Sequence, residues 1–209
     1  QFPKDLSVED ILIRSSNIGT LMLAQKVGEK DYKEFIRETN LLNTPKLELE
    51  ELGNPLSFEW NKCKLETISY GHGIAVTPLQ ATATYAALTN GGRIIQPTII
   101  HKENYKENKK IISSQTSKKI NTILRKVVTE KEGTASLANI YGYDVGGKTG
   151  TSQKYKNIKN NLNTFISVFP ASNPKYVLFV MLENPQVATN LVYNYRGIKI
   201  KGTRNEAGW

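Results

Sequence analysis

The sequence predicts an α+β domain in which an antiparallel sheet packs between helices. The chain up to Gly133 contains apolar residues at helical spacing and several helix-capping signals, whereas residues 143–184 contain three runs rich in β-branched and aromatic residues. The link "ASNPK" at residues 171–175 is too short for a crossover helix, so the strands on either side of it must be antiparallel. Helices first and an antiparallel sheet last indicate a layered α/β/α domain.

Two short helices are expected at the start of the chain, with a break between them. Ser7 and Asp10 form a capping box that opens the first helix, "VEDILIR". This helix stops at the "SSN" of residues 15–17. A second helix, "IGTLMLAQKV", follows and ends at Gly28.

A third helix, "YKEFIRET", is expected to begin at a capping box formed by Asp31 and Glu34. Residues 43–66 carry glycine and proline and show no steady hydrophobic period, so they are interpreted as a long irregular segment. A second polar loop is expected at residues 101–114.

The two strongest helix predictions lie further along the chain. In "VTPLQATATYAALTNGG", Thr77 is the expected N-cap, Pro78 lies in the first turn, Gln80 completes a capping box and Gly91 ends the helix. The next helix ends near Gly133 and has an apolar stripe opposite its Lys and Arg residues, made by Ile120, Ile123, Leu124, Val127 and Val128.

Three strands are then expected, "YDVGGKTGTSQ", "NTFISVFPA" and "KYVLFVMLEN". The tail from Val187 to Trp209 has no clear period. No internal repeat or second domain boundary is evident, so residues 1–209 are interpreted as part of one domain.

Composition excludes several classes of function. The single cysteine, Cys63, allows no internal disulfide and no cysteine-cluster metal site, and His72 and His101 lack partners at metal-ligand spacing. The net charge is +9, but the basic runs mix Lys with Asn and Glu and lack Arg, so no nucleic acid partner is expected.

The stretch "VGGKTGTSQK", residues 145–154, indicates a backbone that an anion can approach closely. One interpretation is a phosphate loop, because Gly142 to Thr149 matches GxxxxGK[ST] and Glu183 could be an acidic magnesium ligand. That loop requires a buried strand before it and a helix after it. "ASLANIY" is a poor strand, and "TSQKYKNIKNN" is a poor helix, which makes a P-loop NTPase a remote alternative.

The favoured interpretation places Lys-Thr-Gly, residues 148–150, on a strand beside a cleft. Lys-Thr-Gly together with a distant Ser-x-Asn is the pairing of penicillin-binding proteins and serine β-lactamases. The Ser-x-Asn is Ser15-Ser16-Asn17, although Ser16 or Asn17 could instead simply cap the second helix.

The resemblance extends over most of the chain. The stretches "SSNIGTLMLAQKVG", "ISYGHGIAVTPLQATATYAAL", "GGKTGTSQK" and "VFPASNPKYVLFVMLENP" resemble the transpeptidase domain of class B penicillin-binding proteins, in particular the septal, FtsI-type branch. This resemblance implies the serine β-lactamase/D,D-peptidase fold, with no metal or other cofactor. It also implies a serine acyl-enzyme that cross-links peptidoglycan stem peptides at D-Ala-D-Ala and is trapped by β-lactam antibiotics.

The resemblance also implies roles for particular residues. Lys148 and Thr149 would bind the terminal carboxylate, since a cation and a hydroxyl suit that anion. Gly150 would let the ligand lie along the strand edge, and the Thr151 N–H would form half of an oxyanion hole.

Two further residues would act in proton transfer and positioning. Ser15, tuned by Lys148, would relay a proton toward the leaving amine. Asn17 would hold the substrate amide and the catalytic lysine.

The nucleophilic Ser-x-x-Lys motif is expected upstream of this chain. The only match, Ser172 to Lys175, lies in a strand link and contains Pro174, whereas the motif must begin a helix. The chain is therefore interpreted as the C-terminal portion of a transpeptidase domain, incomplete at both ends.

The resemblance further implies an upstream membrane anchor, a position on the periplasmic face of the bacterial inner membrane, and divisome partners that include a glycosyltransferase. A β-lactam sensor or another non-catalytic penicillin-binding domain of the same fold is the alternative.

Overall fold

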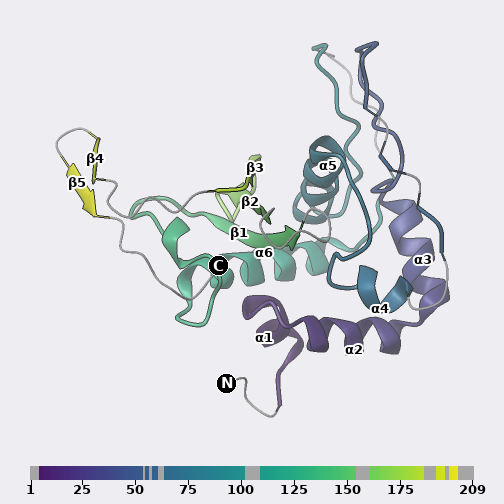
Figure 1. Cartoon of the computed structure of the whole chain (residues 1–209), viewed down its shortest axis with the longest axis horizontal. Coiled ribbons are helices and arrows are strands. Elements are labelled where there is room, and N and C mark those ends of the chain that lie inside the picture. The colour runs from purple at the N-terminus through teal and green to yellow at the C-terminus, as the bar shows by residue number, and fades with distance from the viewer. Residues whose placement is uncertain are drawn as a thin grey trace. The chain divides into compact units, whose positions relative to one another are not determined.

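The computed structural model describes residues 5–53, 55–56, 58–60, 64–101, 109–153 and 161–185, and the backbone of 192–195 and 198–201 (Figure 1). The chain divides into two compact units. The first consists of Gln1–Thr149 and Phe165–Phe179, and the second of Gly150–Thr164 and Val180–Trp209. The division cuts through all three strands of the main sheet.

The two N-terminal helices of the first unit form as the sequence predicts. Helix α1, Val8–Ile13, begins at the complete Ser7–Asp10 capping box. Helix α2, Asn17–Val27, begins at Ser16, whose Oγ accepts a hydrogen bond from the Gly19 N–H at 3.1 Å. Helix α1 packs against α2 and also against α6, which lies above it in Figure 1.

The next two helices depart from the prediction. Helix α3, Glu29–Glu38, has Gly28 as its N-cap and no side-chain cap, so the box predicted at Asp31 is wrong and the helix starts earlier. The described residues of 43–63 form neither helix nor strand, in agreement with the predicted irregular segment. That segment ends at α4, Lys64–Ile68, which the sequence analysis did not anticipate because the helix has too few residues to establish a period.

Helix α5, Pro78–Thr89, has the predicted N-cap at Thr77. Gln80, however, does not reach back to complete a capping box. Its Nε2 donates to the backbone carbonyls of Asn40 and Asn43, at 2.5 and 3.1 Å, and its side chain is almost fully buried. Gln80 therefore supplies hydrogen-bond donors to two carbonyls in the turn that follows α3, and these bonds connect that turn to α5.

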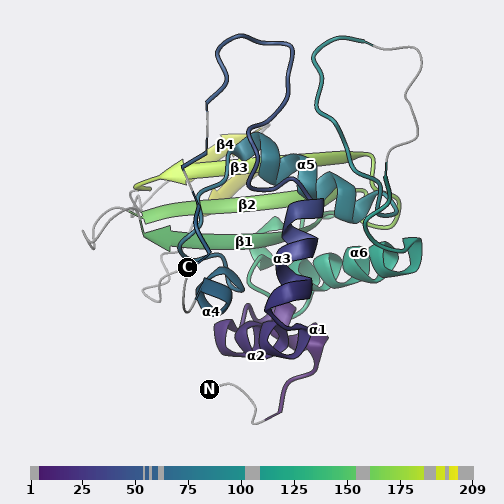
Figure 2. The same cartoon turned by 90° about the vertical axis from the view of Figure 1, so that its right-hand side faces the viewer.

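Helix α6, Ser114–Thr129, has Ser113 as its N-cap, and a short 3-10 helix, η1, follows at Ser136–Ala138. The predicted apolar stripe of α6 forms two clusters. One contains Val127 and Val128 with Ile13 of α1, and the other contains Leu124 with Val168. Tyr85 of α5 joins the second cluster, so α5 and α6 cover the same side of the sheet in the first unit (Figure 2).

The three predicted strands are present as β1, Gly146–Gln153, β2, Asn161–Phe169, and β3, Tyr176–Glu183, in the order β1-β2-β3. Hydrogen bonds at both ends of the β2–β3 pair indicate the expected antiparallel arrangement. The Lys175 N–H donates to the Phe169 carbonyl in the first unit, and the Asn184 N–H donates to the Asn161 carbonyl in the second.

The second unit also contains a hairpin that the sequence analysis missed. Strands β4, Val192–Tyr195, and β5, Ile198–Lys201, pair antiparallel, with Val192 opposite Lys201. The strands are too short for alternation to stand out in the sequence. In the part of the chain described above, no helix has both the length and the apolar character that crossing a membrane requires.

A polar cluster in the first unit holds the start of β1 in place. Arg125 of α6 donates from Nη1 to the Val145 carbonyl at 2.7 Å, and its Nε lies 3.3 Å from Asp144 Oδ1. Asp144 also accepts the Ser172 N–H at 2.8 Å, from the link between β2 and β3. Hydrogen bonds from the side chain and backbone of Ser172, together with the Arg125 charge, hold the pKa of the Asp144 carboxyl below its usual value.

Replacing Asp144 is expected to make the protein less stable in a pH-dependent way. Because the pKa is lowered in the folded state, the stabilisation is present above the unfolded value of 3.8 and is lost as the pH falls through the folded value. We expect Asp144→Asn to lower the free energy of unfolding at pH 7 by about 1–2 kcal/mol, allowing for solvent screening.

Urea unfolding at pH 7 and at acidic pH measures this effect. The gap between wild type and variant should shrink in acid. A gap that stays constant with pH would show that the ionised carboxylate is not responsible.

Candidate active site

Ser15 lies at the break between α1 and α2 in a backbone conformation that few non-glycine residues adopt. Its φ is +55°, in the left-handed region. The turn is fixed on both sides, because the Ser15 N–H donates to the Leu12 carbonyl at 3.3 Å and the Ser16 N–H donates to the Ile11 carbonyl at 2.9 Å. The Ser15 side chain is exposed and not needed for packing, which points to a functional reason for the strain.

The structure brings Ser15 and Lys148 together across 133 residues of sequence. Lys148, on β1, donates from Nζ to Ser15 Oγ at 2.8 Å and to the Thr149 carbonyl at 3.0 Å. An ammonium has one more N–H donor than these two bonds use, so one donor is left for a ligand. Because Ser15 Oγ accepts from Lys148, its own hydroxyl proton is free to be donated elsewhere.

Burial changes the acid–base behaviour of Lys148. The side chain is largely removed from water, and this desolvation lowers the pKa of the ammonium from 10.5 to about 8. At neutral pH the group is therefore still mostly protonated and can bind an anion. Its pKa is nevertheless close enough to neutrality for the group to exchange a proton during a reaction.

Thr149 is the next residue of β1 and is half-buried. Its Oγ1 donates to the Thr134 Oγ1 at 2.7 Å. Thr134 is exposed and lies in the turn between α6 and η1. The sequence analysis passed over Thr134, because a single threonine after a glycine has no distinctive spacing.

The glycines before Lys148 have a different role from the one the sequence indicated. Gly146 and Gly147 are buried, and a Cβ on Gly147 would lie 2.7 Å from both the Ile166 carbonyl oxygen and the Phe165 ring. The lack of a side chain at Gly147 therefore lets β1 approach β2 rather than a ligand.

The position of Lys148 also rules out a phosphate loop. Lys148 lies within β1, whereas that loop requires a lysine at the start of a helix. The remote alternative of a P-loop NTPase is therefore wrong.

Gly150 and Thr151 belong to the second unit, where the Gly150 carbonyl accepts a hydrogen bond from Thr164 Oγ1 at 3.2 Å. The Thr151 side chain is exposed. Among the described strands β1 has one neighbour, β2, so the strand leaves an edge to which an extended ligand could add. The oxyanion role of the Thr151 N–H stays a prediction.

The remaining predicted residues lie at the start of α2 and in the link between β2 and β3. Asn17 is the first residue of α2 and is exposed, while Ser16 caps that helix, so the capping interpretation of Ser16 is correct without excluding roles for Ser15 and Asn17. Ser172 and Lys175 lie in the irregular link between β2 and β3, outside any helix. That position does not meet the helical requirement of a Ser-x-x-Lys nucleophile motif.

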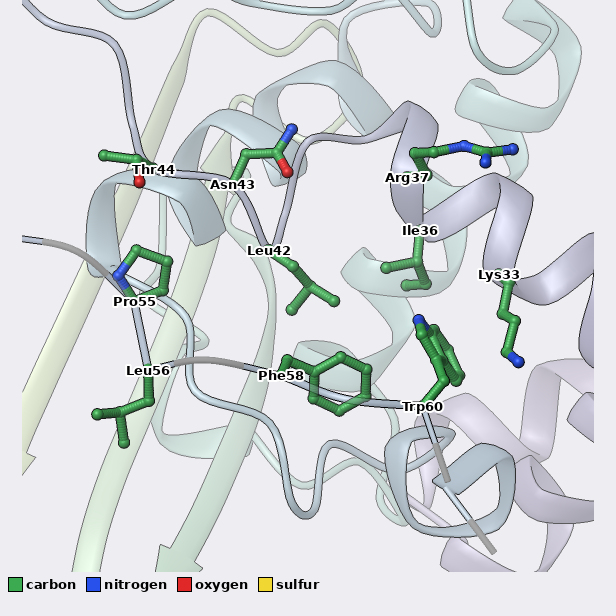
Figure 3. A pocket seen from close by; sticks show the side chains of 10 residues that line it. All are labelled: Lys33, Ile36, Arg37, Leu42, Asn43, Thr44, Pro55, Leu56, Phe58 and Trp60. Atoms are coloured by element: carbon green, nitrogen blue, oxygen red, sulfur yellow. The ribbon is translucent and has the colours of Figure 1, made fainter. Parts of the chain in front are cut away.

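A separate hollow lies beside α3, and none of its lining residues is a predicted site residue. Its volume is about 520 Å³, and Figure 3 shows the side chains of Leu42 and Ile36 above those of Phe58 and Trp60. The Lys33 ammonium lies 4.9 Å from the centre of the Trp60 ring. Among the described residues, no group of three or more His, Cys, Asp and Glu side chains could hold a metal ion.

Comparison with known proteins identifies a family that this chain matches. A family model described as the penicillin-binding protein transpeptidase domain matches residues 1–203. The chain is 32% identical over 200 residues to the probable peptidoglycan D,D-transpeptidase FtsI of Caulobacter vibrioides, covering 88% of this chain and 34% of the relative. It is 31% identical over 196 residues to the stage V sporulation protein D of Bacillus subtilis, covering 85% and 30%.

Solved structures show the same fold. The transpeptidase domain of penicillin-binding protein 3 from Burkholderia pseudomallei matches with a TM-score of 0.80 and 26% identity, covering 86% of this chain and 57% of that one. Penicillin-binding protein 3 from Mycobacterium tuberculosis, complexed with aztreonam, matches with a TM-score of 0.77 and 28% identity, covering 86% and 45%. The chain spans about a third of the length of the curated relatives named above.

The strained backbone at Ser15 leads to a stability test that is independent of function. Ser15→Gly and Ser15→Ala both remove the hydroxyl, but only glycine adopts a φ of +55° without steric cost. We expect the glycine variant to be more stable than the alanine variant by about 1 kcal/mol, measured by thermal unfolding. The same pair of changes at the exposed helical residue Lys118 should give the opposite order, because glycine is a poor helix former. Alanine as the more stable variant at Ser15 would contradict the left-handed conformation.

The lowered pKa of Lys148 leads to a second test. Below about pH 8 the folded protein holds a desolvated charge, and the resulting penalty disappears as the pH rises toward the unfolded value of 10.5. We expect Lys148→Met to raise the free energy of unfolding at pH 7 by about 1–3 kcal/mol, and by less at pH 10, in urea unfolding. A variant less stable than wild type at both pH values would contradict this result.

Proposed function

Because the chain belongs to the penicillin-binding protein transpeptidase domain family, we propose that it is part of a peptidoglycan D,D-transpeptidase. In this proposal the protein attacks the D-Ala-D-Ala end of a stem peptide, forms a serine acyl-enzyme and transfers the acyl group to the amine of a neighbouring stem. β-Lactam antibiotics acylate the same serine.

The hydrogen bond from Lys148 to Ser15 is the observation that carries the proposal. It joins a strand and an inter-helix turn that are distant in sequence, and it couples an acid–base group to a hydroxyl at 2.8 Å. The pairing was predicted from two short motifs, and the folded chain has a direct contact between them. The lowered pKa of Lys148 suits a group that transfers protons near neutral pH.

The terminal carboxylate of the stem peptide binds at Lys148 and Thr149. The ammonium supplies its unused N–H donor and most of the charge, and Thr149 supplies a hydroxyl. Gly150 and the Thr151 N–H, at the open edge of β1, receive the peptide backbone and stabilise the oxyanion.

Ser15 delivers the proton to the leaving amine. Its hydroxyl already accepts a hydrogen bond from Lys148, so it donates its own proton as it gains one from the lysine. No net charge is then left on Ser15. Asn17, at the start of α2, holds the amide of the substrate.

The nucleophilic serine, in a Ser-x-x-Lys motif, is part of this proposal as a residue of the longer protein. The proposed location is the periplasmic face of the inner membrane, with an upstream anchor helix. A role in septal synthesis, together with divisome proteins and a glycosyltransferase, is the finer proposal. It is supported by the similarity to the probable peptidoglycan D,D-transpeptidase FtsI of Caulobacter vibrioides and to a peptidoglycan D,D-transpeptidase FtsI homolog of Mesostigma viride.

Acylation of the full-length protein by a fluorescent penicillin tests the proposal. We expect Lys148→Ala to reduce the second-order acylation rate constant by at least about a hundredfold, because a charge-assisted contact and the proton relay are both lost. Peptide mapping should locate the adduct on a serine outside residues 1–209. Lys118→Ala, which removes an exposed lysine from α6, is the matched control and should acylate like wild type. Equal rates for wild type and Lys148→Ala would reject the role of Lys148.

A further inference from the structure

Thr134 is hydrogen-bonded to a residue of the proposed carboxylate site. Its hydroxyl is the acceptor of the Thr149 hydroxyl proton, at an Oγ1 to Oγ1 distance of 2.7 Å. Thr149 is one of the two residues proposed to bind the substrate carboxylate. A hydrogen-bond partner directly behind a binding hydroxyl decides where the proton of that hydroxyl points.

The turn that carries Thr134 is tightly constrained. The Gly133 N–H donates to the Glu130 carbonyl at 3.0 Å, and the Ala135 N–H donates to the Val127 carbonyl at 3.2 Å. A Cβ on Gly133 would lie 2.2 Å from the Val127 carbonyl oxygen, so only glycine lets the chain turn back this closely on α6. The turn is thus built around the end of α6 and is not a loose loop.

The residue after Thr134 anchors the same turn in the hydrophobic core. Ala135 is 5% exposed and packs with Ile13, Val127 and Val128. Glu132 forms a long ion pair with Arg14, the residue before Ser15, with a 3.9 Å separation. Thr134 is therefore held between a buried neighbour and an ion pair that reaches the turn carrying Ser15.

We propose that Thr134 is a positioning residue for carboxylate recognition by Thr149, an inference that rests on the proposed function. In the empty site Thr149 donates its proton to Thr134. When a carboxylate binds, the Thr149 hydroxyl rotates to donate to it, and the Thr134 hydroxyl rotates to donate to Thr149 Oγ1. No covalent bond changes, and each hydroxyl keeps one proton.

This two-hydroxyl chain has two physical advantages over a lone threonine. Hydrogen bonds in a chain polarise one another, so the Thr149 hydroxyl becomes a stronger donor when it also accepts from Thr134. The hydrogen bond to Thr134 also holds the Thr149 side chain in one rotamer before the ligand arrives, so less side-chain freedom is lost on binding. The two hydroxyls should affect the binding only of ligands that carry the carboxylate. The test therefore compares a ligand that has this carboxylate with one in which it is blocked.

The test compares acylation of the full-length protein by a penicillin and by the methyl ester of the same penicillin. Thr134→Val keeps the shape of the side chain and removes the hydroxyl. We expect it to slow acylation by the free acid about tenfold, the effect of one lost hydrogen bond near a charged ligand, and to leave acylation by the ester within about twofold of wild type. Thr134→Ser, which keeps a hydroxyl, should restore the rate with the free acid.

A matched control and a double-mutant cycle isolate the pathway through Thr149. Thr122→Val makes the same change at an exposed position on α6, where Thr122 Oγ1 donates to the Lys118 carbonyl, and should have no effect. In a Thr149→Val background, Thr134→Val should cause no further loss, since the residue through which it acts is gone. Thr134→Ala repeats the comparison if Thr134→Val does not fold.

Each outcome is decisive. Equal slowing with the acid and the ester would show that Thr134 only supports the fold, and it would overturn the inference. Wild-type rates in both hydroxyl-free variants would do the same. If the wild-type protein is acylated by neither compound, the proposed function itself fails, and the inference fails with it.

Discussion

The contact between the Lys148 ammonium and the Ser15 hydroxyl is the interaction on which the rest of the site depends. It requires a strand that carries a cation toward an inter-helix turn, and a turn that directs a hydroxyl toward the strand. Both requirements oppose local stability. Lys148 is charged in a largely dry position, and Ser15 is held in a left-handed backbone conformation.

The surrounding structure compensates for these two costs. The turn at Ser15 lies between two capped helices, and α1 packs on the apolar stripe of α6. The start of β1 is held by Arg125 and Asp144, and Gly147 lets the strand lie close against β2. A polar and strained pair is thus supported by a packed core, which is the usual arrangement where a protein binds or transforms a ligand.

The features that the sequence predicted correctly are those that depend on near neighbours. The caps at Ser7 and Thr77, the apolar stripe of α6 and the three strands follow from spacings of a few residues. Gln80 was placed correctly but interpreted wrongly, because its true partners are carbonyls more than 30 positions away. The contact between Ser15 and Lys148 was predicted only because two motifs of one family occur together, and Thr134, which lies outside those motifs, was missed.

The single neighbour of β1 among the described strands has a consequence for how copies of this protein behave toward one another. A strand edge that is open enough to accept a peptide is also open to the same edge of another molecule. The composition of β1 works against that second event. Three glycines make it a poor partner for another strand, since they would cover little apolar surface. The glycine-rich composition of β1 therefore reduces the tendency of this edge to pair with another copy.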